Sequence, residues 1–113
     1  MPIFVKSSLP RLVLASASPR RLDICHSIGL KPIVITGSCQ EVQEGLPTAV
    51  VCENSRRKAL AAASLAEPQD LLIASDTIVV RGEQILGKPR NQEDACAMLL
   101  SLKNSWHQVY SGL

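Results

Sequence analysis

The hydrophobic residues of this chain gather in short runs separated by polar stretches, a pattern that predicts strands alternating with helices. Six short segments are expected to be strands, and they cover residues 11–15, 32–36, 71–75, 77–80, 84–86 and 106–110. The third can end at Asp76 or continue directly into the fourth. Residues 81–83, with a central glycine, predict a hairpin turn before the fifth.

Residues at the segment boundaries place three helices between these strands. The first is expected to begin at Pro19 and run to about residue 28, because Ser18 is a suitable N-cap and proline is favoured at the first helical position. Gly29 suits the position after its last turn. The side chains of this helix that we expect to be buried are Leu22, Cys25 and Ile28.

The second helix is longer, from a cap at Thr48 to about Ala66, and its alanines have high helix propensity. The third is expected over 92–102, because Asn91 and Asp94 resemble a capping box. Its buried side chains are expected to be Ala95, Met98, Leu99 and Leu102. Strands alternating with helices predict an α/β fold with a mixed, partly parallel sheet flanked by helices.

The composition narrows the class of protein. With 113 residues, 46% hydrophobic content and a formal net charge of +2, the chain fits one globular domain and not a disordered segment. One Trp, one Tyr and one Phe are too few for a protein that stacks its rings on single-stranded nucleic acid. The small net charge gives no overall attraction to DNA or to membranes, so we expect no nucleic-acid and no membrane partner.

The cysteines indicate a reduced environment. Cys25, Cys39, Cys52 and Cys96 lie far apart and form no Cys-x-x-Cys pair, which argues against a zinc site. We also expect neither a signal peptide nor a membrane span, because no charged leader precedes a long apolar run. Reduced thiols in a cytoplasmic protein are the simplest interpretation.

The turn after the first strand is the first candidate for chemistry. A helix N-terminus offers unpaired N–H groups and the positive end of the helix dipole. The polar residues around it are Ser16, Ser18, Arg20 and Arg21. A guanidinium can bind two phosphate oxygens at once, so this turn predicts a phosphate site. The alternative is an ordinary capping motif with two solvated arginines, and Ser-Pro-Arg-Arg alone fits both.

Asp76 is the second candidate, since ligands gather at the carboxyl ends of strands in open α/β sheets. A carboxylate there can bind Mg²⁺ or accept a proton from water. The alternative is an aspartate that caps the following turn. Thr77 either points into the same pocket or is an ordinary strand residue.

Three further charged residues have a functional and an ordinary interpretation. Lys88 lies between a glycine and a proline, an arrangement that fixes a cation in a short loop. Lys58 belongs to a basic cluster on the long helix, for which a solvated helix face is the alternative. Glu41 lies on a polar loop, where a surface position is the alternative.

Taken together, these segments resemble the Maf family of nucleoside triphosphate pyrophosphatases, also called septum-formation inhibitor or Maf-like proteins. The resemblance follows the family's order and approximate spacing from residue 11 to the end of the chain. It rests on Leu-Ala-Ser-Ala-Ser-Pro-Arg-Arg at 14–21, Arg-Lys-Ala at 57–59, Ser-Asp-Thr-Ile-Val at 75–79, Leu-Gly-Lys-Pro at 86–89, and the segments 93–99 and 107–112. The expected fold is Maf/ITPase-like, with residues 1–10 as an N-terminal extension and 11–113 as a partial domain.

The resemblance implies hydrolysis of a nucleoside triphosphate between its α and β phosphates, with a divalent metal such as Mg²⁺ or Mn²⁺. The aspartate that matches Asp76 would accept a proton from the attacking water and, with the acidic residue that matches Glu41, bind the metal. The residues that match the phosphate-binding positions are Ser16, Arg20, Arg21, Lys58 and Lys88. A triphosphate carries about four negative charges, so cations and metal-binding carboxylates suit its transfer chemistry.

The resemblance also implies a type of substrate, and the sequence departs from the family pattern at three places. The uninterrupted Ser-Pro-Arg-Arg is similar to members of the dTTP/UTP type, whereas members that prefer 7-methyl-GTP tend to carry an extra aromatic residue there. Arg20 and Thr77 match positions tied to this choice. The departures are Ser75 in place of the usual alanine, Gln40 at an often acidic position, and Asn54-Ser55 where an apolar residue and alanine are more common.

Family members continue well beyond the last strand into a second half with further pocket residues, and we expect this C-terminal half to be absent here. An exposed sheet edge and an apolar face should result, with low stability or self-association, for example as a homodimer. Two alternatives to an active enzyme stay open. One is a nucleotide-binding or division-regulatory module without catalysis, and the other is a truncated product without activity.

Overall fold

The computed structural model describes residues 10–113, which form two three-stranded sheets and three helices. Residues 1–9, most of the expected N-terminal extension, lie outside the described residues. In the described part of the chain no helix is both long and apolar enough to cross a membrane. The mixture of a parallel and an antiparallel sheet with helices confirms the predicted α/β class.

The parallel sheet contains β1 (Leu12–Leu14), β2 (Ile33–Val34) and β3 (Leu71–Ile73), with β1 in the middle. Arg11 and Asp70 join the starts of β1 and β3. The Arg11 Nε and Nη2 atoms donate to the two oxygens of Asp70 at 2.9 and 2.6 Å. The hydrogen bond from Arg11 lowers the pKa of Asp70, so this contact holds while Asp70 is ionised.

The antiparallel sheet contains β4 (Asp76–Arg81), β5 (Gln84–Leu86) and β6 (Gln108–Gly112), with β4 in the middle. Gly82 has a φ of +61°, which confirms the predicted hairpin turn between β4 and β5. The last strand begins two residues later than expected and ends two later, because its pairing with β4 runs from Gln108 opposite Val80 to Gly112 opposite Asp76. Trp106 lies before this pairing and is 95% exposed.

The apolar run from residue 71 onward is interrupted and does not form one strand. Ala74 and Ser75 separate β3 from β4, and the two strands join different sheets. Each half finds its own partners: β3 pairs with β1, and β4 pairs with β5 on one side and β6 on the other. Asp76 is the first residue of β4 and therefore lies where one sheet passes into the other.

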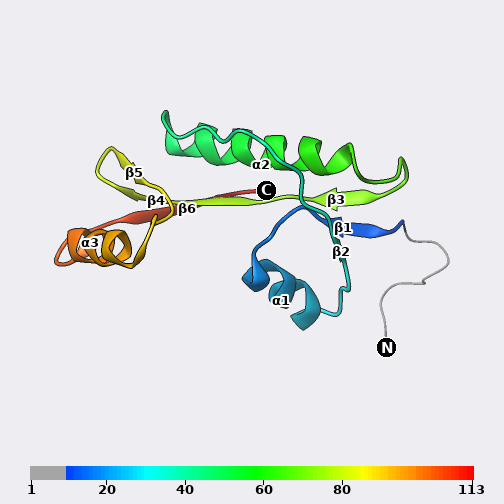
Figure 1. Cartoon of the computed structure of the whole chain (residues 1–113), viewed down its shortest axis with the longest axis horizontal. Helices are drawn as coiled ribbons and strands as arrows, with labels where there is room; N and C mark the ends of the chain where they lie inside the picture. Colours follow the sequence, from blue (N-terminus) through cyan, green and yellow to red (C-terminus); the bar gives the residue numbers. More distant parts are fainter. Residues whose placement is uncertain (1–9) are drawn as a thin grey trace.

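A single helix, α2 (Pro47–Ala63), extends along one side of both sheets (Figure 1). Its first half packs Val50 and Val51 against Ile78 and Val80 of β4. Its second half packs Ala62 with Ala15 and Ala74, which directly follow β1 and β3. The helix begins one residue before the expected cap, because a proline suits the first helical position, and it ends at Ala63 and not at Ala66.

The ends of α1 (Pro19–Ser27) follow the prediction. Ser18 is the N-cap residue with Pro19 next to it, although the Ser18 side chain makes no capping hydrogen bond. At the other end Gly29 has a φ of +86°, and its N–H donates to the carbonyl of His26 at 3.1 Å. The burial prediction is wrong in part, because Cys25 is buried but Leu22 is half-buried and Ile28 is 66% exposed.

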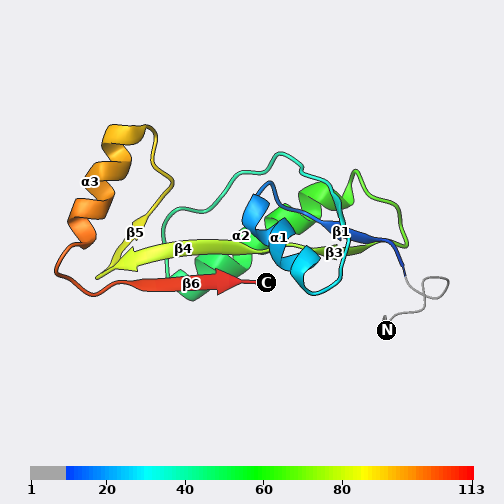
Figure 2. The ribbon, with the colours of Figure 1, turned by 90° about the horizontal axis from the view of Figure 1, so that it is seen from below.

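The third helix, α3 (Gln92–Leu102), has the predicted cap but not the predicted burial. The Asp94 N–H donates to the Asn91 side chain at 2.8 Å. The helix contains no buried residue, and Leu99 is 70% exposed. It lies beside the β4–β5 hairpin at one end of an elongated molecule of 51 × 31 × 25 Å (Figure 2), where no second layer of the described chain covers it. The side chains wrongly expected to be buried are Ala95, Met98, Leu99 and Leu102.

The last residue of β6 packs against the backbone of α2. A Cβ atom at Gly112 would overlap the carbonyl oxygen of Val51 and lie 2.6 Å from its carbonyl carbon. Gly112→Ala is therefore expected to lower the free energy of unfolding by about 1–3 kcal/mol in a denaturant titration. Gly87→Ala is the control, since nothing lies within 4 Å of its added carbon. Equal stability of the two variants would contradict this packing.

Candidate functional site

A pocket of about 600 Å³ opens at the junction of the two sheets. Residues 15–19 before and at the start of α1, the loop 36–41, α2 and the start of β4 all contribute to its lining. Asp76 is 6% exposed there and stands between the two apolar clusters that α2 covers. A buried carboxylate needs polar partners, and these partners define the site.

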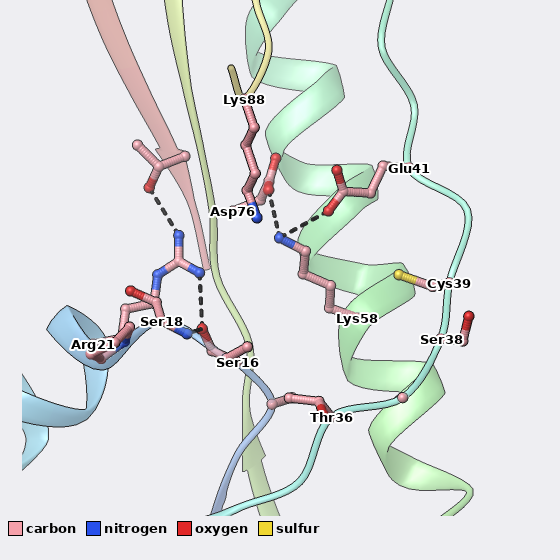
Figure 3. A pocket seen from close by; sticks show the side chains of 15 residues that line it. Ser16, Ser18, Arg21, Thr36, Ser38, Cys39, Glu41, Lys58, Asp76 and Lys88 are labelled. Atoms are coloured by element: carbon pink, nitrogen blue, oxygen red, sulfur yellow. Dashed lines mark hydrogen bonds and ion pairs between the residues drawn. The ribbon is translucent and has the colours of Figure 1, made fainter. Parts of the chain in front are cut away.

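Lys58 of α2 brings two carboxylates together. Its Nζ donates to Oδ1 of Asp76 at 2.7 Å and lies 3.2 Å from Oε1 of Glu41 (Figure 3). Burial of the ammonium opposes its charge, but the hydrogen bonds and charges of Asp76 and Glu41 outweigh this effect, so the pKa of Lys58 is raised. Lys58 is thus a fixed cation within the pocket and not part of a solvated helix face.

The turn after β1 forms a second polar group at the same pocket. Arg21 donates from Nη1 to Oγ of Ser16 at 3.1 Å and from Nη2 to Oγ1 of Thr77 at 3.2 Å. The Ser16 hydroxyl also accepts the N–H of Ser18 at 3.1 Å, which closes the turn. These contacts fix the Arg21 guanidinium at the beginning of α1, next to the start of β4.

The structure places the predicted site residues, with one exception, around one pocket. Those that line it are Ser16, Arg21, Glu41, Lys58, Asp76, Thr77 and Lys88. Lys88 extends from the loop after β5 toward the carboxylate of Asp76 (Figure 3). Arg20 is exposed and does not belong to the lining, because the neighbouring Arg21 occupies the position facing Ser16 and Thr77.

Comparison with known proteins identifies the family. The family model described as Maf-like protein matches residues 11–113. The chain belongs to the Maf-like protein family. It is 42% identical over 118 residues to the dTTP/UTP pyrophosphatase of Agathobacter rectalis and 42% identical over 108 residues to that of Vibrio cholerae.

These alignments cover most of the Maf-like chain but only part of its relatives. They include 93% and 94% of the chain, and 58% of each of those two relatives. The dTTP/UTP pyrophosphatase of Lachnoclostridium phytofermentans is 41% identical over 104 residues, which are 91% of the chain and 53% of that relative. The chain therefore spans little more than half the length of these curated relatives.

Two polar residues outside the predicted set belong to the hydrogen-bond network of the site. Asn54 of α2 donates from Nδ2 to Oδ2 of Asp76 at 3.3 Å. The hydroxyl of Ser111 in β6 lies 2.9 Å from that of Thr77. The signal for Asn54 is its position four residues before Lys58, on the same face of the helix. Ser111 has no such local signal, because its place depends on the pairing of β6 with β4.

The carboxylates of Asp76 and Glu41 are the groups that suit a divalent metal. Within residues 10–113 no cluster of three or more His, Cys, Asp and Glu side chains forms a complete protein site for a metal ion. Mg²⁺ is commonly bound by one or two carboxylates together with phosphate oxygens and water. Asp76 and Glu41 supply two hard oxygen donors to the lining of one pocket and fit that mode, which requires a phosphate ligand to complete the coordination.

Removal of the Lys58 cation should leave Asp76 buried without its closest partner. Lys58→Met is expected to lower the free energy of unfolding at pH 7 by about 1–3 kcal/mol, measured by denaturant titration. Because the pKa of Lys58 is raised in the folded chain, its contribution is complete below the ordinary lysine pKa and disappears as pH rises through the raised value. The wild type and the variant should therefore converge in stability in strongly alkaline solution, and a constant difference would contradict the ion pair.

Proposed function

We propose that this Maf-like chain hydrolyses a nucleoside triphosphate, dTTP or UTP, to the nucleoside monophosphate and pyrophosphate. The observation that carries the proposal is the buried Asp76, held by Lys58 in the same pocket as the Ser16–Arg21 turn. The names of the relatives, dTTP/UTP pyrophosphatase, support the same reaction and substrates.

The cations of the pocket are suited to a polyphosphate. Arg21, Lys58 and Lys88 belong to three different elements and line one hollow. The N–H groups at the start of α1 add the positive end of a helix dipole beside Arg21. Phosphoryl transfer depends mainly on positioning and neutralisation of charge, so these groups would hold the β and γ phosphates and stabilise the departing pyrophosphate.

Asp76 is the proposed proton acceptor. Oδ1 is occupied by the short contact with Lys58, whereas Oδ2 makes only the longer contact with Asn54 and is the freer oxygen. Water attacks the α-phosphorus, its proton passes to Oδ2 of Asp76, and the bond from that phosphorus to the bridging oxygen breaks, so that pyrophosphate leaves. Bound to Asp76 and Glu41, a Mg²⁺ or Mn²⁺ ion would neutralise phosphate charge and lower the pKa of water.

Base selection is a finer part of the proposal. Thr77 contacts both Arg21 and Ser111, so it links the phosphate turn to β6. In this position its side chain is proposed to contribute to the choice of base. For Arg20 the resemblance implies a role in phosphate binding and substrate choice, whereas its exposed position outside the pocket lining argues against that role, and the arginine test below distinguishes the two. The cytoplasmic location, a homodimer and the lack of nucleic-acid and membrane partners stay predictions from the sequence.

The direct test measures pyrophosphate release from dTTP and UTP in the presence of Mg²⁺ or Mn²⁺. Asp76→Asn is expected to reduce turnover by a factor of about 10²–10⁴, because the amide cannot accept the proton. Asp23→Asn, at an exposed position of α1, is the matched control and should keep wild-type turnover. Full turnover by Asp76→Asn would disprove the role of Asp76. Nucleotide binding by the wild type without pyrophosphate release would favour a binding or regulatory module.

The two adjacent arginines provide a test of the phosphate site. Calorimetric titration with a triphosphate should show an affinity about 10–100-fold weaker for Arg21→Ala, because its charged hydrogen bonds are lost. Arg20→Ala removes the same charge from an exposed position and should change the affinity less than about threefold. A larger loss for Arg20→Ala than for Arg21→Ala would contradict the geometry of this turn.

A further inference from the structure

Asn54 is a buried polar residue that the proposed reaction does not use directly. It is 2% exposed and lies in α2 between Val50 and Val51, which pack on β4, and the alanines that pack on the parallel sheet. A buried side-chain amide is costly unless its donors and acceptor have partners. The partners of Asn54 therefore indicate why an amide occupies this position.

The amide of Asn54 binds both backbone groups of one loop residue. Its Oδ1 accepts the N–H of Val42 at 2.7 Å, and its Nδ2 donates to the carbonyl of Val42 at 2.9 Å. This is the pair of bonds that a neighbouring strand would otherwise supply. Val42 directly follows Glu41, so Asn54 fixes the backbone beside that carboxylate.

The loop that carries Glu41 has no regular secondary structure and runs antiparallel to α2, along its side chains. One turn after Asn54, Lys58 contacts the side chain of Glu41, and Arg57 donates to the carbonyl of Gln40. At Gly37 a Cβ atom would lie 2.6 Å from the carbonyl oxygen of Ala61, another turn further on. Asn54 is thus the buried end of a row of contacts that attaches the loop to the helix.

The same amide also reaches the proposed proton acceptor. With both hydrogens of Nδ2 in use, one on Val42 and one on Oδ2 of Asp76, Asn54 connects the Glu41 loop to the aspartate. Lys58 binds the other oxygen of Asp76 and the side chain of Glu41. Asn54 and Lys58, which lie four residues apart on one face of α2, therefore hold the two carboxylates in place.

We propose that Asn54 is a positioning residue that sets the place of Glu41 relative to Asp76. It acts through the Val42 backbone on one side and through Oδ2 of Asp76 on the other. The proposed catalytic consequence rests on the function given above, whereas the placement of the loop does not. An apolar residue at this position could not bind the Val42 backbone, so other contacts would have to place the loop.

The experiment compares two substitutions by hydrogen exchange and by steady-state kinetics in the 113-residue chain. Asn54→Leu removes every contact of the amide, so the Val42 N–H should exchange at least about fivefold faster. Turnover should fall about 10–100-fold, with less than about a threefold change in the KM for dTTP. Asn54→Asp keeps an acceptor for the Val42 N–H but places a second carboxylate against Asp76. Asn54→Asp should lose as much turnover as Asn54→Leu, but the exchange rate of the Val42 N–H should change less.

Ser55→Ala is the matched control on the same helix. Ser55 is also buried, but its hydroxyl donates only to the carbonyls of Val51 and Cys52 within α2. It should keep wild-type exchange at Val42 and wild-type turnover. Unchanged Val42 exchange in Asn54→Leu, or equal effects of Ser55→Ala, would overturn the proposal. If the wild type releases no pyrophosphate, the proposed function fails, whereas the exchange of Val42 still decides whether Asn54 places the loop.

Discussion

The contact between Lys58 and Asp76 joins the parts of the structure that would otherwise be separate. Asp76 begins β4 where one sheet passes into the other, and α2 is the element that packs on both sheets. Apolar side chains near the two ends of α2 cover the sheets, so its polar side chains in the middle face the junction. Because the carboxylate is buried there, its charge requires the ammonium of Lys58, and the position of the helix and the position of the site depend on each other.

The surrounding loops are held to this centre by polar contacts. The turn after β1 is closed by Ser16 and tied to β4 through Arg21 and Thr77. The loop with Glu41 is attached to α2 along a row of side chains that begins at Asn54. As a result, cations and carboxylates from distant parts of the chain converge on one pocket, although no single segment carries a complete site. This distribution explains why the order of the motifs along the chain is more informative than any single motif.

Local signals predicted local features well. Pro19 at the start of α1, Gly29 after it and Gly82 in the hairpin each need only their own backbone geometry, and the structure confirms them. The break at Ala74 and Ser75, the exposed Leu99 and the late start of β6 depend on which distant partner each segment finds. The same holds for the site. The motifs placed Lys58 and Glu41 among the candidates, but only the packing of α2 distinguished a pocket cation from a solvated helix face.

The proposed function requires that this pocket binds a triphosphate with its α-phosphorus beside Asp76. The decisive measurement is a crystal structure with Mg²⁺ and a UTP analogue that has an imido bridge between its α and β phosphates. We expect the β and γ phosphates to lie against Arg21 and the start of α1, and the α-phosphate to face Asp76, with Glu41 and Asp76 as the carboxylates that would hold the metal ion. A nucleotide bound outside this pocket, or with its α-phosphate away from Asp76, would contradict the proposed function.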